Sequence, residues 1–154
     1  MGKYADRACE LFLGGANCAQ SVFAAFSEPL GLDEEFCLKI SSAFGGGMGR
    51  MREVCGAVSG MLMVAGLLRG YAQHNDTDKK AIYELTQSMA ERFKKAHGTI
   101  ICRELLKLPS SLPESPEPTK RDEKFYKDRP CIRFVETAAL LAEELLDNSP
   151  NNDI

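Results

Sequence analysis

The most apolar stretch of the chain, residues 54–68, limits the fold more than any other segment. It has 15 residues, whereas a helix that spans a membrane needs roughly 20. Gly56, Gly60 and Gly66 lie within it, and each glycine inside a helix costs about 1 kcal/mol relative to alanine. Several such glycines favour close approach by another helix. The segment therefore predicts a buried, glycine-rich core helix over about residues 52–69.

Apolar residues at helical spacing, bounded by start and stop residues, predict further helices on both sides of this segment. Asn17 and Gln20 have the spacing of a capping box. The first of these helices ends at Gly14, the second runs over about 18–27, the third starts at Asp33, a long one runs from Asp76 or Asp78 to Gly98, a short one starts at Thr99, and the last runs from Pro130 to Leu146. Phe36, Ile40 and Phe44 share one face of the third helix. The residues expected to point inward from the long helix are Ile82, Leu85, Met89, Phe93 and Ala96.

These segments predict an all-α fold, a compact bundle of five to seven helices in a single domain over residues 1–147. The glycine run 45–49 is expected to be a turn, since it fits neither a P-loop nor a dinucleotide fingerprint. Residues 109–128 are rich in proline and predict a mobile connection inside the domain. Residues 148–154 are expected to form a disordered tail.

Composition narrows the possible partners and the compartment. The net charge is −3, which offers no basic field for nucleic acid. No apolar signal core follows the charged N-terminus, and no segment is long enough for membrane insertion, so we expect a cytoplasmic protein. Stable disulfides are rare there, and cysteines are more often catalytic, redox-sensing or metal-binding.

Four of the six cysteines lie near predicted helix N-termini: Cys18, Cys55, Cys102 and Cys131. Backbone N–H groups at a helix start favour the thiolate, which is both nucleophile and metal ligand. We therefore expect these four residues to share one site as catalytic thiols or metal ligands. The alternative is that they pack as small buried apolar residues. For Cys9 and Cys37, which lie inside predicted helices, this core interpretation is favoured.

The cysteine spacing leaves the chemistry open. No Cys-x-x-Cys pair occurs, and the successive gaps between the four cysteines are 37, 47 and 29 residues. Four thiols could hold zinc or a two-iron cluster, or cycle between dithiol and disulfide as two pairs. Cys55 is the expected attacking thiol, because Arg50 and Arg52 stand close before it in sequence.

Two motifs and two single cysteines resemble a known family. The motifs are Gly15-Ala16-Asn17-Cys18-Ala19-Gln20-Ser21-Val22 and the run 45–49 followed by Cys55-Gly56-Ala57-Val58-Ser59-Gly60; the single cysteines are Cys102 and Cys131. Together they resemble the C-GCAxxG-C-C family of redox-active four-cysteine proteins, over roughly residues 8–142. The resemblance implies a redox role, a possible iron–sulfur cluster and a transporter association. Gly56 and Gly60 are the candidate cofactor-binding residues.

Three functions remain open from the sequence. The first is a redox protein that uses the four cysteines as thiols or around an iron–sulfur cluster, with an unknown redox partner. The second is a zinc-binding protein without catalysis. The third is a helical binding protein, a partner of a membrane transporter, whose cysteines are merely buried. A homodimer formed through the glycine-rich helix is a further possibility, with packing inside one chain favoured.

Overall fold

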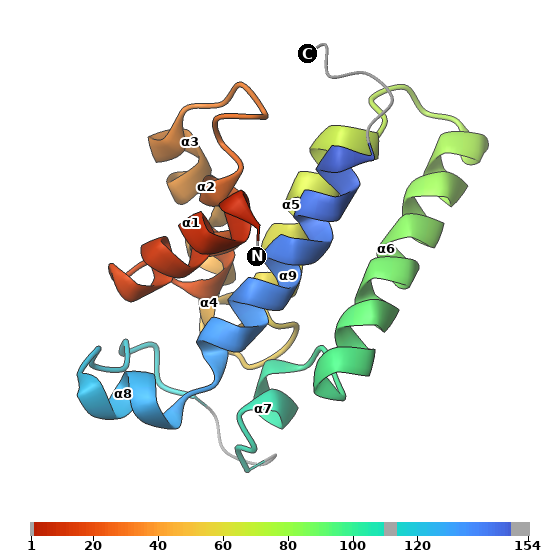
Figure 1. Cartoon of the computed structure of the whole chain (residues 1–154). Coiled ribbons are helices and arrows are strands. Elements are labelled where there is room, and N and C mark those ends of the chain that lie inside the picture. The colour runs from red at the N-terminus through yellow and green to blue at the C-terminus, as the bar shows by residue number, and fades with distance from the viewer. Residues whose placement is uncertain (1, 110–113, 149–154) are drawn as a thin grey trace.

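The computed structural model describes residues 2–109 and 114–148, and every regular element there is helical (Figure 1). The prediction of an all-α fold is confirmed. Within these ranges there is no strand, only one isolated bridge between Val54 and Ile101. In chain order the elements are α1 (Lys3–Leu13), α2 (Cys18–Ala25), α3 (Glu34–Ser41), the 3-10 turn η1 (Ser42–Phe44), α4 (Gly45–Met48), α5 (Gly56–Arg69), α6 (Asp76–His97), α7 (Cys102–Leu105), α8 (Glu123–Asp128) and α9 (Cys131–Asp147).

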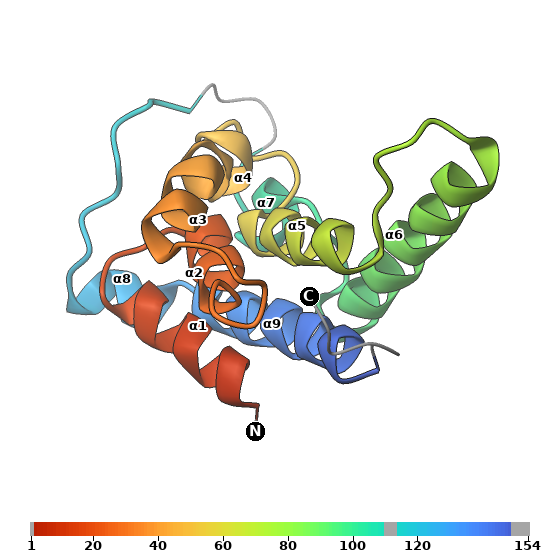
Figure 2. The ribbon, with the colours of Figure 1, turned by 90° about the horizontal axis from the view of Figure 1, so that it is seen from above.

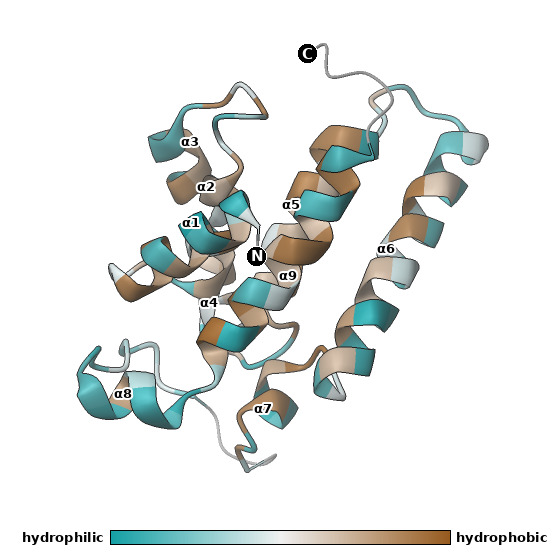
Figure 3. Ribbon diagram, in the orientation of Figure 1, coloured by the Kyte–Doolittle hydropathy of each residue, from teal (hydrophilic) through white to brown (hydrophobic). Residues whose placement is uncertain are grey.

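The core lies where α5 packs between α2 and α9, with α1 covering α2 and α9 from the other side (Figures 1 and 2). Helix α5 is apolar over much of its length, whereas α6 at the edge of the molecule is more polar (Figure 3). A Cβ atom added to Gly60 would stand 2.8 Å from the backbone oxygen of Ala19 in α2. The close helix partner at Gly60 is thus α2 of the same chain.

The predicted capping box at the start of α2 is confirmed. The Gln20 N–H donates to Asn17 Oδ1 over 2.9 Å, and the Asn17 N–H donates to Gln20 Oε1 over 3.0 Å. Helix α6 ends as predicted at Gly98, whose φ of 93° lies in the left-handed region that favours glycine. Local signals therefore suffice for the start of α2 and the end of α6.

The apolar faces of α3 and α6 are buried only in part. In α3 the side chains of Phe36 and Ile40 are each 51% exposed, while Cys37 and Ser41 are buried. Helix α6 buries Met89 and Phe93, but Ala96 is exposed and Ile82 and Leu85 are only partly buried, because this helix covers the core along part of its length. Phe44 is likewise only partly buried.

The start of α5 is also later than predicted. The helix begins at Gly56 and not at Arg52, because Arg50 and Arg52 have φ values of 72° and 63°, which no right-handed helix contains. Cys55 is therefore the N-cap residue of α5.

The Pro-rich stretch contains a helix that the sequence pattern did not predict. In α8 the Asp122 carboxylate accepts a hydrogen bond from the Phe125 N–H over 2.9 Å, and the Phe125 ring is buried. Residues 110–113 of the expected mobile connection, and residues 149–154 of the expected tail, lie outside the described residues. Among the described helices, none has the length and hydropathy that crossing a membrane requires.

Candidate functional site: a cavity lined by cysteines and arginines

Cys18, Cys55, Cys102 and Cys131 all line one cavity of about 290 Å³. The first residues of α2, α5, α7 and α9 line this cavity. Figure 1 shows α5, α7 and α9 beginning at the same end of the molecule. The four cysteines that the sequence grouped by helix position thus face a common space. Cys9 and Cys37 do not line it. All six thiols are free.

Each of the four cysteines stands at a helix start. Cys18, Cys102 and Cys131 are the first residues of α2, α7 and α9, and Cys55 is the N-cap residue of α5. The cavity is therefore bordered by backbone N–H groups that lack partners within their own helices.

Two backbone hydrogen bonds hold the segments around Cys55 and Cys102 side by side. The Cys55 N–H donates to the Ile100 carbonyl over 2.7 Å, and the Cys102 N–H donates to the Glu53 carbonyl over 2.6 Å. Gly47 permits this approach, because an added Cβ would stand 2.7 Å from the Cys102 Cβ and 2.8 Å from the Glu53 nitrogen.

The backbone from α4 onward is left-handed over several residues. Besides the glycines there, Met48, Arg50 and Arg52 have φ values of 66°, 72° and 63°. A residue with a Cβ in this region costs roughly 1–2 kcal/mol, so the local backbone stores strain beside the cavity. Arg50 and Arg52 belong to this left-handed stretch.

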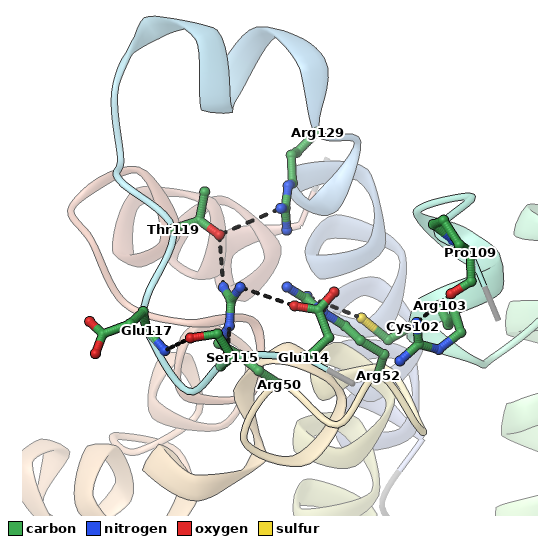
Figure 4. A network of polar contacts seen from close by, with 10 residues as sticks. All are labelled: Arg50, Arg52, Cys102, Arg103, Pro109, Glu114, Ser115, Glu117, Thr119 and Arg129. Carbon is green, nitrogen blue, oxygen red and sulfur yellow. Dashed lines mark hydrogen bonds and ion pairs between the residues drawn. The ribbon is translucent and has the colours of Figure 1, made fainter. Parts of the chain in front are cut away.

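The Arg52 guanidinium lies inside the protein, between Glu114 and Cys102 (Figure 4). Its Nη1 donates to Cys102 Sγ over 3.7 Å, and its Nε is 3.5 Å from Glu114 Oε1. Arg50 donates to Glu114 Oε2 over 3.1 Å, to Thr119 Oγ1 over 2.7 Å and to the Ser115 carbonyl over 2.8 Å. The two arginines thereby fix residues 114–119 over the cavity.

Two further arginines line the cavity on the side of α8. The Arg121 guanidinium lies 4.5 Å from the ring centroids of both Phe12 and Phe125, and it donates to the Phe12 carbonyl over 3.2 Å. Arg129 contacts the Thr119 hydroxyl over 3.5 Å. Sequence analysis missed both arginines, because they lie in the Pro-rich stretch and no local motif marks them.

The pKa values of the Cys131 and Cys18 thiols are shifted in opposite directions. A hydrogen bond from the Cys18 thiol is the largest cause that lowers the pKa of Cys131 to about 7; Arg129, Arg121 and Arg52 lower it further and burial opposes them. The same hydrogen bond, with burial, raises the pKa of the Cys18 thiol well above its usual range. The arginines therefore favour a negative charge on Cys131 over a negative charge on Cys18.

The other two cavity thiols are kept protonated. Burial raises the pKa of Cys55 to about 12, although the N–H groups of Ala57 and Val58 oppose the shift. Burial also raises the pKa of Cys102, against the influence of Arg52. Cys55 is the attacking thiol expected from the sequence; burial opposes its ionisation, and Arg52 is directed to Cys102 instead.

The arrangement does not match a formed metal centre. Within residues 2–109 and 114–148, no three His, Cys, Asp or Glu side chains are grouped closely enough to hold a metal ion. Of the two candidate cofactor-binding glycines, Gly56 lines the cavity, whereas Gly60 packs against α2 and does not.

Comparison with known proteins identifies the family of the chain. Residues 16–145 match the family described as "putative redox-active protein (C_GCAxxG_C_C)", a range that contains all four cavity cysteines. No curated protein and no solved structure matches the chain. The match covers most of the sequence, and the protein therefore belongs to the C_GCAxxG_C_C family.

Proposed function

We propose that the protein is a thiol–disulfide redox protein in which Cys131 attacks a disulfide and Cys18 resolves the intermediate. The observation that carries this proposal is that Cys18 and Cys131 line one cavity together with Arg52, Arg121 and Arg129. These arginines lower the pKa of Cys131, which is the first residue of α9. A thiol with a pKa near the working pH is the best attacking group in thiol–disulfide exchange.

The reaction proceeds in two balanced steps. The Cys131 thiolate attacks one sulfur of a substrate disulfide, a mixed disulfide forms on Cys131, and the other substrate sulfur leaves as a thiolate. Cys18 then gives its proton to that thiolate and attacks the Cys131 sulfur, which forms a Cys18–Cys131 disulfide and releases the second substrate thiolate. The substrate gains two electrons and the cysteine pair loses two. A dithiol reductant is the redox partner that would restore the reduced pair.

The cytoplasm suits this chemistry, because it keeps thiols reduced. Cys55 and Cys102 take no part in the exchange between Cys131, Cys18 and the substrate, since burial raises the pKa of both thiols.

The test follows the mixed disulfide. Reduced protein is mixed with hydroxyethyl disulfide at pH 7 without oxygen, and the products are mapped by mass spectrometry of peptides. We expect Cys18→Ser to accumulate the mixed disulfide on Cys131, and Cys131→Ser to remain unmodified on the same time scale. Cys37→Ser is the matched control and should behave as the unmodified protein. A Cys131→Ser variant that forms mixed disulfides at the original rate would refute the proposal.

A metal centre is the second candidate, favoured by the fact that four thiols line one cavity. Its test is an anaerobic preparation assayed for iron and zinc and scanned from about 300 to 700 nm, where iron–sulfur clusters absorb. One cluster or one zinc ion per chain, lost in each of the four Cys→Ser variants, would replace the thiol–disulfide proposal. Metal-free protein that shows the Cys131 reactivity described above would support the thiol–disulfide proposal.

A further inference from the structure

We infer that the cavity selects small anionic substrates, namely disulfides that carry carboxylate or other oxyanion groups. This inference rests on the proposed function, because it names the substrate class of the same site. Among the described residues that line the cavity, every formally charged side chain is an arginine: Arg50, Arg52, Arg121 and Arg129.

Arg52 gives the strongest indication that the cavity binds a ligand with an acceptor oxygen. Its side chain is 3% exposed, and its Nε–H has no hydrogen-bond partner in the described part of the chain. The Glu114 carboxylate stands 3.5 Å away without the geometry of a hydrogen bond, and it is shared with Arg50. A buried guanidinium N–H without an acceptor is costly, so an oxygen supplied by a ligand would relieve a cost already present.

The charge balance of the cavity points the same way. Arg121 donates to backbone carbonyls and Arg129 to a hydroxyl, so the hydrogen-bond partners described for these two are uncharged. Glu114 contacts Arg50 and Arg52, and the Cys131 thiolate adds a second negative charge. Positive charge therefore remains in excess next to the attacking sulfur. Arginine forks pair with carboxylates and other oxyanions through two parallel hydrogen bonds.

The size of the cavity limits the substrate. A volume of about 290 Å³ lies at the lower end of the range for small-molecule sites. Two chemical sources present an anionic oxygen group beside a reducible sulfur–sulfur bond: organic disulfides with carboxylate ends, and inorganic polythionates. The shared chemistry is the oxyanion, and the test separates the two sources.

The test compares disulfides that differ in charge. Wild-type protein is reacted with dithiodipropionate (anionic), hydroxyethyl disulfide (neutral), cystamine (cationic) and tetrathionate (an inorganic anion), and each rate is divided by the rate of the same compound with N-acetylcysteine. We expect the anionic compounds to react about tenfold faster than cystamine on this scale. A larger gain for dithiodipropionate than for tetrathionate assigns the organic source, and the reverse order assigns the inorganic one.

Arginine variants connect the preference to the cavity. Arg52→Gln and, independently, Arg129→Gln should lose most of the preference for anions while keeping a folded circular dichroism spectrum. Arg92→Gln is the matched control, because Arg92 lies on the surface in an ion pair with Glu144 and does not line the cavity. An equal normalised rate for all four compounds, with Cys131 still the modified residue, would overturn the inference and leave the proposed function intact.

A binding measurement covers the case in which no disulfide reacts. Thiodipropionate carries the same two carboxylates as dithiodipropionate but has no sulfur–sulfur bond. Calorimetric titration should detect its binding to wild-type protein and to Arg92→Gln, and not to Arg52→Gln. Binding with this pattern in an unreactive protein would refute the proposed redox step and retain the anion site, whereas absence of binding to the wild type would overturn the site itself.

Discussion

Cys37 and Cys131 are both buried, yet their surroundings differ in kind. Cys37 lies inside α3, where burial raises its pKa and the nearby Asp33 and Glu34 raise it further. Cys131 is the first residue of α9, where a hydrogen bond from Cys18 and three arginines outweigh burial. Burial by itself makes a thiol inert. What distinguishes the cavity thiol is the set of charges and donors that the fold brings to it.

The largest expected effect concerns the rate of alkylation by iodoacetamide. A thiol with a pKa near 7 is about half ionised at pH 7, and one with a pKa near 9 is about 1% ionised, a difference of about 50-fold in thiolate. Cys131→Ser should remove the fast phase of alkylation, and Cys37→Ser should leave it unchanged. The rate constant of the fast phase, followed between pH 5.5 and 9, should reach half its maximum near pH 7. A fast phase of alkylation that survives in Cys131→Ser would show that Cys131 is not the reactive thiol and would remove its contrast with Cys37.

The next effect separates packing from reactivity. Gly60 and Gly66 both lie in α5, but an added Cβ at Gly60 meets the backbone of α2, and one at Gly66 meets nothing within 4 Å. We expect Gly60→Ala to lower the free energy of unfolding by about 1–3 kcal/mol. Gly66→Ala should raise it by up to about 1 kcal/mol, through helix propensity.

Urea denaturation of both variants measures these changes. Because α2 carries Cys18, Gly60→Ala should also slow the alkylation of Cys131, whereas Gly66→Ala should not. Equal stability of the two variants would mean that α2 is not held by close contact at Gly60.

The smallest expected effect is the pH dependence of stability. The folded pKa of Cys131 lies below its ordinary value, so its stabilising contribution is present above the ordinary thiol pKa and is lost as the pH falls through about 7. The difference in unfolding free energy between wild type and Cys131→Ser should therefore grow from pH 6 to pH 9. We expect a change on the order of 1 kcal/mol, because the raised pKa of Cys18 offsets part of it.

Cys55 should show the opposite sign. Its folded pKa is raised to about 12, so its contribution is present below the ordinary thiol pKa and is lost as the pH rises above that value. Urea denaturation of reduced Cys55→Ser, compared with wild type from pH 8 to pH 10, measures this loss. Parallel stability curves for wild type and both serine variants would contradict the two pKa shifts.

Local sequence signals were enough to place the cysteines but not their surroundings. The Asn17–Gln20 capping box and the prolines and glycines next to helices put Cys18 and Cys131 close to helix starts, and the structure has both as first residues. The partner of Arg50, by contrast, is 64 residues away at Glu114, a pairing that no local pattern encodes. The left-handed backbone at Arg52 could not be predicted from local sequence either, because Arg52 contacts Cys102, which is distant in sequence.

The position of the arginines along the chain has a consequence for biosynthesis. Arg121, Arg129 and Cys131 all belong to the last third of the sequence, and their influence on one another requires the folded arrangement. A nascent chain on the ribosome, and a chain that has been released but has not yet folded, therefore exposes only thiols of ordinary acidity. The lowered pKa of Cys131 arises only in the native state, so rapid alkylation at neutral pH should count the correctly folded molecules.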